Sequence, residues 1–361
     1  MKLIKLQLKK RSYNIIVGSN IIKFLGKYIS RLNVGDTAYV ITNAAIKDKY
    51  GKILNRTFRQ YGFNLIFKLI PATEKSKSLR MASSIIKGMA GCDRRARVFI
   101  VAFGGGVIGD LASFIASIYK RGIPYINVPT TLLAQVDSGI GGKTAVDLME
   151  GKNLVGTFYQ PRLVFSDVDV LRTLNLRQIK TGLAEVIKYG AIKDPSLFVY
   201  LEKKYKDILK LKKATLEFIV SRCSYIKAKV VQQDEREEKG IRTILNFGHT
   251  LGHAIETAGN YKRYNHGEAL ALGMLIACDI SNKLGLLRQA TSKRIERLID
   301  KVGLPTKIKN ISVPNIIEAH YRDKKFIGPL NRFVLIKDIG RIKIAENIPL
   351  KVIREALEKR I

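Results

Sequence analysis

An uninterrupted apolar run followed by closely spaced glycines constrains the fold of this chain more than any other feature. Residues 98–103 read Val-Phe-Ile-Val-Ala-Phe, and Gly104-Gly105-Gly106-Val107-Ile108-Gly109-Asp110 follows directly. A run that is apolar at every position is typical of a strand buried on both faces of a parallel sheet. The glycines predict a tight turn into an apolar helix. They also interrupt the hydrophobic stretch, which argues against a membrane span.

The first half of the chain repeats this alternation of strand and helix. Strands are predicted at 38–42, 64–69, 98–103 and 125–128, and helices at 45–60, 78–91 and 108–120. Short β-rich runs that alternate with longer amphipathic segments predict a mainly parallel sheet covered by helices. We therefore expect a Rossmann-like α/β domain.

The second half changes to helical periodicity. Helices are predicted at 178–191, 196–206, 211–236, 248–259, 267–284, 288–302 and 349–360, with one late strand at 332–336. A chain of 361 residues exceeds a typical single domain. We expect an α/β domain over 1–175 and a helical domain over 176–361, packed together with a site in the cleft between them.

The strong positive charge raises nucleic acid as a partner. The chain carries 64 basic and 30 acidic residues, a formal net charge of +34. The basic residues are spread over nearly every segment, tryptophan is absent, and no nucleic-acid-binding module is recognisable. We favour compositional bias over nucleic-acid binding, which stays open as an alternative of a different class.

The expected cellular setting follows from the cysteines and the N-terminus. Cys92, Cys223 and Cys278 are far apart and predict neither a disulfide framework nor a cysteine zinc site. No apolar secretory segment follows Met1. We expect a cytoplasmic protein without membrane segments.

Two glycine-rich regions predict a phosphate-bearing ligand. Gly104–Gly109 has the spacing G-x-G-x-x-G between a strand and a helix, which lets the backbone approach a pyrophosphate, although a purely structural turn would also use these glycines. The sequence lacks the acidic residue about 20 positions further on that usually holds a ribose. A second loop region, 136–144 with 151–153, combines glycines, hydroxyls and lysines. Ser138 replaces the first glycine of a P-loop, so ATP binding is not expected.

The histidines predict a metal. Three of the four lie within His249–His266, and His249 and His253 have the four-residue spacing that presents two imidazoles on one helix face. By spacing alone this pair would be the ligands, with His266 and a carboxylate completing a catalytic site for Zn²⁺. Glu185 and Lys188 share a helix face in an apolar segment and are expected to be partly buried. Helix capping and core packing are the structural alternatives.

Taken together, these motifs resemble the 3-dehydroquinate synthase family among the sugar-phosphate cyclases. The resemblance rests on segments 104–110, 129–131, 136–144, 151–153, 182–190, 246–253 and 266–268. It implies an N-terminal NAD-binding domain, a C-terminal metal-binding domain, and Zn²⁺ or Co²⁺ as the metal. It further implies a homodimer.

The resemblance also implies roles for individual residues. The metal ligands would be Glu185, His249 and His266, with His253 moved to the substrate. NAD contacts would be Glu74, Lys77, Gly106, Val107, Ile108, Gly109, Asp110, Thr130, Thr131, Lys143, Lys152, Val170, Leu171, Arg172 and Thr173. Substrate contacts would be Arg121, Asp137, Lys143, Asn153, Lys188, Lys227, Arg242, Asn246, His253 and Lys324. Arg121 resembles the arginine that one subunit of the family lends to its neighbour's phosphate site.

The implied reaction belongs to the shikimate pathway of aromatic amino acid biosynthesis. It converts 3-deoxy-D-arabino-heptulosonate 7-phosphate to 3-dehydroquinate and phosphate by transient oxidation with NAD, phosphate elimination, re-reduction and aldol closure. Another sugar-phosphate cyclase and a metal-dependent polyol dehydrogenase are the alternatives. The family usually has glycine where this chain has Thr73, so a left-handed backbone there would strain the residue.

Overall fold

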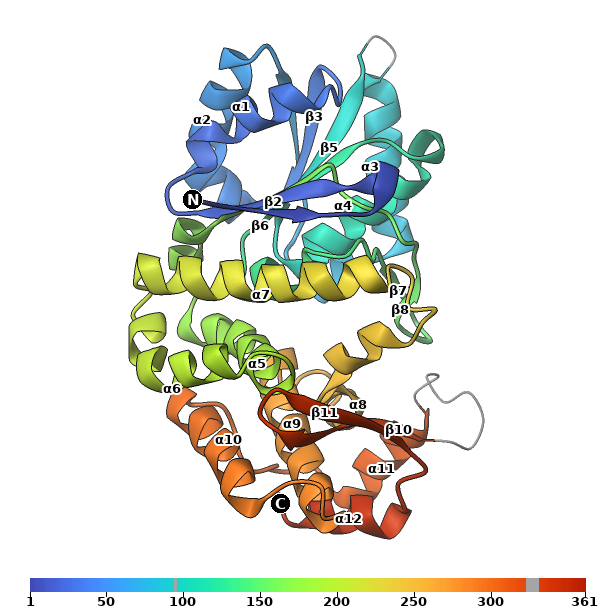
Figure 1. Ribbon diagram of the computed structural model, residues 1–361. Helices are drawn as coiled ribbons and strands as arrows, with labels where there is room; N and C mark the ends of the chain where they lie inside the picture. Colours follow the sequence, from blue (N-terminus) through green and yellow to red (C-terminus); the bar gives the residue numbers. More distant parts are fainter. Residues whose placement is uncertain (94–95, 323–330) are drawn as a thin grey trace. The chain divides into compact units, whose positions relative to one another are not determined.

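Figure 1 shows a computed structural model of the chain, which describes residues 1–93, 96–322 and 331–361. The chain divides into two compact units: unit 1 is Met1–Leu174 with Leu216–Arg236, and unit 2 is Asn175–Thr215 with Glu237–Ile361. Helix α7 (Lys213–Gln233) therefore belongs almost entirely to unit 1. The sequence grouped it with the helical half, because periodicity identifies a helix but not the core against which it packs.

Unit 1 is built on a seven-stranded sheet in the order β1-β2-β9-β6-β5-β3-β4. Every neighbouring pair is parallel except β1 and β2, which are antiparallel. The strands are β1 (Lys2–Leu6), β2 (Tyr13–Gly18), β3 (Thr37–Thr42), β4 (Asn64–Leu69), β5 (Val98–Gly104), β6 (Tyr125–Pro129) and β9 (Leu163–Asp167). A separate antiparallel pair consists of β7 (Val146–Leu148) and β8 (Gly151–Val155).

The centre of the sheet is buried on both faces, which explains the continuous apolar sequence of β5. Phe99, Val101 and Phe103 enter one hydrophobic core, while Ile100 and Ala102 enter the other. Since successive side chains of a strand point to opposite faces, both cores need apolar residues at every position of this strand. The helices of this unit are α1 (Leu25–Ile29), α2 (Ala44–Gln60), α3 (Leu79–Cys92), α4 (Gly106–Ile118) and α7.

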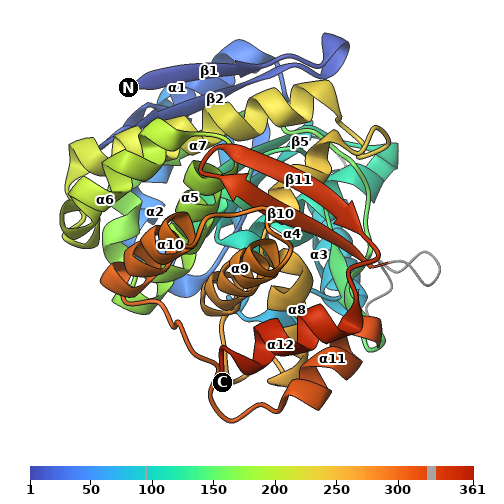
Figure 2. The ribbon, with the colours of Figure 1, turned by 60° about the horizontal axis from the view of Figure 1, so that its bottom comes forward.

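Unit 2 is organised around helix α9. Its helices are α5 (Leu176–Ile192), α6 (Pro195–Leu209), α8 (His249–Ala258), α9 (His266–Lys283), α10 (Gln289–Val302), α11 (Val313–Arg322) and α12 (Leu350–Glu358). Helix α9 contacts α5, α8, α10 and α12, as well as the hairpin of β10 (Arg332–Asp338) and β11 (Arg341–Glu346) (Figure 2). Residues 269–281 of α9 are all buried. A helix that is apolar almost all round is expected at the centre of a helical core.

The predicted fold class, an α/β domain followed by a helical domain, is confirmed. The strands predicted at 38–42, 64–69, 98–103 and 125–128 correspond to β3, β4, β5 and β6. The sequence analysis missed β1, β2, β7, β8, β9, β11, α1 and α11.

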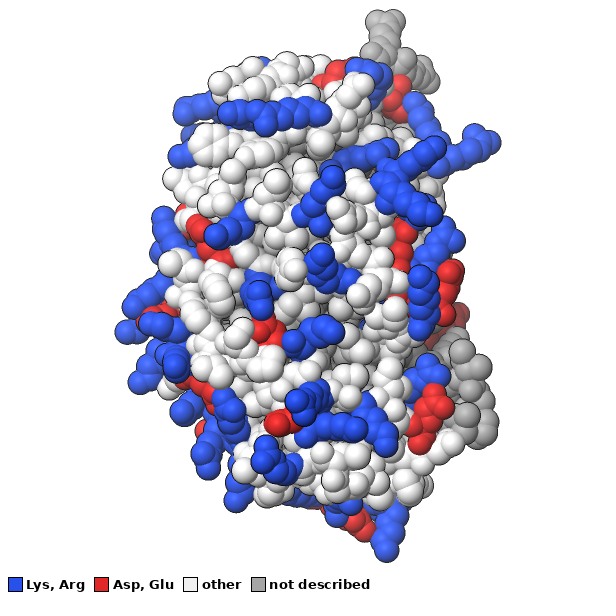
Figure 3. Space-filling model, in the orientation of Figure 1, with Lys and Arg blue, Asp and Glu red and all other residues white. Residues whose placement is uncertain are grey.

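The charged side chains form no single stripe on the face drawn in Figure 3. Lysine and arginine side chains are spread from end to end of this face, with aspartate and glutamate among them. Within the described ranges, no helix combines the length and the apolar character that crossing a membrane would require.

Candidate functional site

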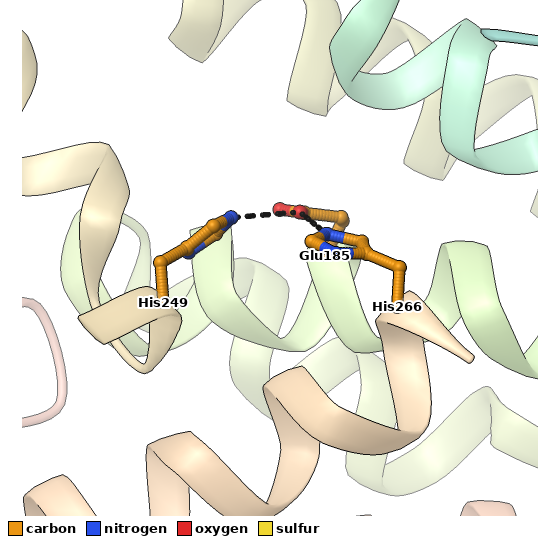
Figure 4. Close-up of side chains that lie close together, drawn as sticks. All are labelled: Glu185, His249 and His266. Atoms are coloured by element: carbon orange, nitrogen blue, oxygen red, sulfur yellow. Dashed lines mark hydrogen bonds and ion pairs between the residues drawn. The ribbon is translucent and has the colours of Figure 1, made fainter. Parts of the chain in front are cut away.

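Three side chains from three helices of unit 2 converge on one point (Figure 4). Glu185 lies on α5, while His249 and His266 are the first residues of α8 and α9. Glu185 Oε1 is 3.4 Å from His249 Nε2 and 3.1 Å from His266 Nε2. One donor atom from each residue lies within 4.8 Å of the others, so the three can hold a metal ion. Zn²⁺ and Co²⁺ accept such a set of imidazole and carboxylate ligands.

Local sequence fixes the two histidines at the starts of their helices. Gly248, the residue before α8, has φ +78°, and a Cβ there would lie 2.6 Å from Met274 Cγ on α9. Only glycine combines this backbone with so close an approach. Before His266, Asn265 and Glu268 form a reciprocal capping box. Glu268 also pairs with Arg177 at 2.7 Å, so this carboxylate supports the helix start.

Glu185 is fully buried and is held as a carboxylate. Lys188 Nζ lies 2.5 Å from Glu185 Oε2, one helical turn away, and the side chain of Lys188 is also buried. Burial raises the pKa of Glu185, but Lys188 and the hydrogen bonds of His249 and His266 outweigh it and lower this pKa well below the usual range. The predicted shared face of Glu185 and Lys188 is thus an interior ion pair.

The two imidazoles have opposite pKa shifts. Burial and the charge of Lys188 lower the pKa of His249, and Glu185 only partly opposes this. Burial also lowers the pKa of His266, but its contacts with Glu185 and Glu256 outweigh this and raise the pKa to about 10. A metal ion requires the neutral ring of either histidine, so His266 must release a proton on binding one.

His253 lies on α8 beside this group. Its ring centroid is 5.3 Å from that of His249 and 6.1 Å from that of His266. With Glu256 and His266 it forms a second group whose donor atoms could hold a metal. The structure therefore brings together all three clustered histidines, while the assignment of ligands among them stays a prediction.

The glycine-rich turn of unit 1 leaves the start of helix α4 open. Gly105 is the N-cap residue and offers no side-chain hydrogen bond to the first N–H groups of the helix. A Cβ on Gly105 would lie 2.9 Å from Thr131 Cγ2, while a Cβ on Gly106 would meet only Ser138 Oγ within 4 Å, at 3.4 Å. The N–H groups of Gly106, Val107 and Ile108 stand at this helix start, where a phosphate group is favoured, whereas Gly109 N donates to Gly105 O at 2.9 Å. Residues of this turn thus fit a dinucleotide pyrophosphate.

The next strand end supports that turn. Thr130 N donates to Gly104 O at 2.9 Å, and Thr131 Oγ1 accepts from Ala134 N at 3.2 Å.

The predicted NAD contacts at 170–173 lie in a short 3₁₀ segment, Val168–Thr173, in which Val170 and Leu171 are buried. In this segment Thr173 Oγ1 donates to Val170 O at 2.8 Å, and Arg172 pairs with Asp169 at 3.4 Å.

A buried lysine links several of the predicted cofactor and substrate residues in unit 1. Lys77 Nζ lies 2.6 Å from Asp110 Oδ2 and also donates to Asn153 Oδ1. Burial lowers the pKa of Lys77, but Asp110 and Asp147 outweigh it and raise this pKa. Burial raises the pKa of Asp110 more than Lys77 lowers it. Nearby, Lys152 Nζ lies 3.6 Å from Glu74 Oε1.

Two predicted substrate residues pair within unit 1. Lys227 Nζ on α7 donates to Asp137 Oδ1 and to Asp137 O, each at 2.8 Å. Asp137 belongs to a π-helical segment, Ala134–Ser138. Lys143, which follows Gly141 and Gly142 in the same loop region, is exposed. These residues place an ammonium group and a carboxylate side by side at the loop predicted to bind polar ligands.

The remaining predicted residues are distributed over both units. Arg242 and Asn246 lie in the 3₁₀ segment Ile241–Asn246 of unit 2, directly before the metal group, and Arg242 Nε is 3.3 Å from Glu237 Oε1. Arg121 of unit 1 is exposed and has φ +65°. Lys324 lies outside the described residues.

The strain expected at Thr73 is absent, because its φ of −118° and ψ of 153° are extended.

Sequence reasoning missed two carboxylates at these clusters. Glu256 Oε2 lies 3.3 Å from His266 Nδ1, and Asp147 Oδ1 accepts from Asn153 N at 2.8 Å. The spacing of His249, His253 and Glu256 on one face of α8 was the available signal for Glu256. The sequence carried no comparable signal for Asp147.

Solved structures with this fold define the class of the protein. The chain superimposes on 2-deoxy-scyllo-inosose synthase, crystallised with carbaglucose-6-phosphate, NAD⁺ and Co²⁺, with a TM-score of 0.89, 27% identity and 100% of each chain covered. It superimposes on 2-epi-5-epi-valiolone synthase from Streptomyces hygroscopicus subsp. jinggangensis, with NAD⁺ and Zn²⁺ bound, with a TM-score of 0.89, 25% identity and 98% of each chain covered. This class is that of the sugar-phosphate cyclases.

Sequence comparison then gives the family. The family models for the 3-dehydroquinate synthase N-terminal and C-terminal regions match residues 67–181 and 182–326. The 3-dehydroquinate synthase of Desulforamulus reducens is 44% identical over 351 residues, which is 96% of this chain and 97% of that protein. The chain belongs to the 3-dehydroquinate synthase family.

Proposed function

We propose that this chain is a phosphate-eliminating lyase that converts 3-deoxy-D-arabino-heptulosonate 7-phosphate to 3-dehydroquinate and phosphate. Its membership of the 3-dehydroquinate synthase family supports this reaction. The observation that carries the proposal is the convergence of Glu185, His249 and His266 from three helices. Residues so far apart in sequence meet with their metal-binding atoms facing one another, which a purely structural role does not require.

We propose Zn²⁺ or Co²⁺ as the metal held by these three residues. A bound divalent cation supplies a Lewis acid that lowers the pKa of a substrate hydroxyl. Glu185 contributes a charged oxygen that Lys188 keeps deprotonated, and the two histidines contribute neutral nitrogens. The metals in the solved structures of 2-deoxy-scyllo-inosose synthase and 2-epi-5-epi-valiolone synthase support this choice.

We propose NAD as the second cofactor, bound at the glycine-rich turn and helix α4. When bound, NAD would supply reversible hydride transfer and would not be consumed. The open helix start can bind the pyrophosphate, and Thr130 N donates to Gly104 O beside it. Thr131 and Lys152 are further proposed contacts of NAD. Lys77 and Asp110 hold each other in place by their ion pair, which fixes the Asp110 side chain near the start of α4.

The substrate is an anion, and the chain supplies cations for it. The proposed contacts include Lys143, Lys188, Lys227 and Arg242. Ammonium and guanidinium groups bind phosphate and carboxylate through charge-assisted hydrogen bonds. Asp137 orients Lys227 through two hydrogen bonds, and Glu185 orients Lys188. Asn153, Asn246 and His253 complete the proposed polar contacts.

We further propose that the chain works in the cytoplasm as a homodimer. In this dimer, Arg121 of one subunit would contact the phosphate site of the other.

The test is phosphate release from 3-deoxy-D-arabino-heptulosonate 7-phosphate by the purified full-length chain. We expect release that needs catalytic NAD, is abolished by a chelator and is restored by Zn²⁺ or Co²⁺, while NADH does not accumulate. Sedoheptulose 7-phosphate and glucose 6-phosphate serve as control substrates. Faster turnover of either would assign another cyclase activity, and steady NADH growth with a polyol would assign a dehydrogenase.

A further inference from the structure

Both ring nitrogens of His266 are engaged by carboxylates. Nε2 lies 3.1 Å from Glu185 Oε1, and Nδ1 lies 3.3 Å from Glu256 Oε2. Glu185 comes from α5 and Glu256 from α8, so two different helices contact the ring that begins α9. The imidazole is therefore held at both edges, with one edge facing the proposed metal position and the other facing away from it.

His249 shows the same division of its two nitrogens. Its Nε2 lies 3.4 Å from Glu185 Oε1, while its Nδ1 lies 3.3 Å from the main-chain oxygen of Phe247. A carbonyl oxygen can only accept, so Nδ1 of His249 is the donor in this contact. With a metal at Nε2, the neutral ring would therefore keep its proton on Nδ1. A carboxylate imposes the same tautomer, which makes Glu256 the counterpart of the Phe247 carbonyl.

The Glu256 side chain is buried and contacts His266. Only 9% of the residue is exposed. Across the described ranges, its carboxylate pairs with His266 Nδ1 at 3.3 Å. A buried carboxylate is costly unless it is paired. Glu256 lies on the same face of α8 as His249 and His253, and this face is next to the start of α9.

We propose that Glu256 is a positioning residue that holds His266 in the tautomer protonated at Nδ1 and orients Nε2 as a metal ligand. The inference rests on the proposed function, because it presumes that Glu185, His249 and His266 bind a metal. A carboxylate behind a metal-bound histidine fixes the ring and raises its basicity, and its loss commonly weakens metal binding by about 10–100-fold.

A competing role for Glu256 is direct metal coordination. Glu256, His253 and His266 form a group that could itself hold an ion. The two roles exclude each other at one atom, since Nδ1 of His266 cannot both donate a proton to Glu256 and bind a cation. A direct ligand would give a second metal ion per chain, whereas a positioning residue leaves one.

The decisive experiment measures Zn²⁺ affinity of the full chain by competition with a chelator, together with metal content per chain. Glu256→Ala removes the acceptor. Glu256→Gln keeps an acceptor oxygen but removes the charge. The matched control is Glu202→Gln, which removes a carboxylate paired with Arg294 at 2.6 Å in unit 2 and outside both metal groups. Co²⁺ absorption spectra of the same variants report the ligand geometry independently of turnover.

We expect one metal per wild-type chain, a dissociation constant raised about 10–100-fold in Glu256→Ala, a smaller rise in Glu256→Gln, and no change in Glu202→Gln. The Co²⁺ spectrum should change in Glu256→Ala. Unchanged affinity in both Glu256 variants overturns the proposal, as does a wild-type content of two metals that falls to one in Glu256→Gln. Glu185→Ala separates the two levels of inference: its loss of metal supports the metal centre whatever Glu256 does, and a wild-type chain without metal overturns both.

Discussion

Lys188 Nζ lies 2.5 Å from Glu185 Oε2, and both side chains are shielded from solvent. The pair shares one face of α5 at a spacing of three residues. Because each charge is buried, each depends on the other for its stability in the interior. The same pair keeps Glu185 ionised. One ion pair therefore stabilises the interior and also keeps a proposed metal ligand in its charged form.

Removing one partner of this pair should destabilise the metal-free protein strongly. We expect Glu185→Ala to lower the free energy of unfolding by about 3–5 kcal/mol, since it removes the carboxylate that pairs with the buried Lys188 ammonium. Urea denaturation of chelator-treated protein measures this. The double variant Glu185→Ala/Lys188→Ala should recover part of the loss. A double variant less stable than the single one would show that the pairing is not the source of the effect.

The two histidine roles can be separated by metal content. We expect His266→Ala to lose bound Zn²⁺ and turnover together, because it removes one of three ligands. His253→Ala should retain one metal per chain and lose turnover, because it removes a proposed substrate contact. Elemental analysis after gel filtration measures the metal. Stoichiometric metal in His266→Ala would refute the ligand assignment, and metal loss in His253→Ala would favour the second group with Glu256.

Metal affinity should increase with pH. In the metal-free protein the pKa of His266 is raised to about 10, so this ring is protonated throughout the neutral range. The pKa values of His249 and Glu185 are lowered, which leaves both groups ready to bind. Binding of Zn²⁺ must therefore release a proton from His266, and its association constant should rise about tenfold per pH unit between pH 6 and 8.

Chelator competition at several pH values, with calorimetry in buffers of different ionisation enthalpy, counts the released protons. His253→Ala is the control, since it leaves the three proposed ligands in place. An affinity that stays flat over this range would mean that His266 is already neutral before the metal binds.

Local pattern predicted most of unit 1 but not all of it. The continuous apolar sequence of β5 and the glycines after it indicate a buried strand and a turn because both properties are visible in consecutive residues. The short strands β7 and β8 have no such pattern: residues 151–155 of β8 are half-buried or exposed, and their pairing depends on the turn between them. Helix α7 was predicted as a helix, but its membership of unit 1 depends on contacts such as that of Lys227 with Asp137.

The candidate site shows the same division between local and long-range information. The four-residue spacing of His249 and His253 is a property of one helix, so spacing alone favoured that pair. Glu185 reaches the histidines only because α5 and α8 both pack against α9. Its contact with His266 spans 81 positions of the chain. Residue spacing carries no information about such packing, and the family resemblance supplied it instead.

The turn that carries Arg121 combines strain with a proposed function. Lys120 and Arg121 have φ of +50° and +65°, a conformation that costs a residue with a side chain about 1–2 kcal/mol. Asp93 supports the turn, because it accepts from Tyr119 Oη at 3.0 Å and pairs with Lys120 Nζ. Burial and this hydrogen bond raise the pKa of Tyr119 to about 12. Strain of this kind is often retained at functional positions.

Arg121→Gly should therefore separate stability from activity. Glycine adopts this backbone without strain, although it also gains freedom in the unfolded chain, so we expect the free energy of unfolding to stay equal or to rise by up to about 1 kcal/mol. Turnover should fall sharply, with the larger effect on KM for the phosphate-bearing substrate. Arg121→Ala is the matched control, because it removes the same guanidinium but keeps the strain. It should lose turnover equally and gain no stability. If both variants lose stability to the same extent, the arginine side chain itself stabilises the fold. If both also keep full turnover, Arg121 has no role in activity.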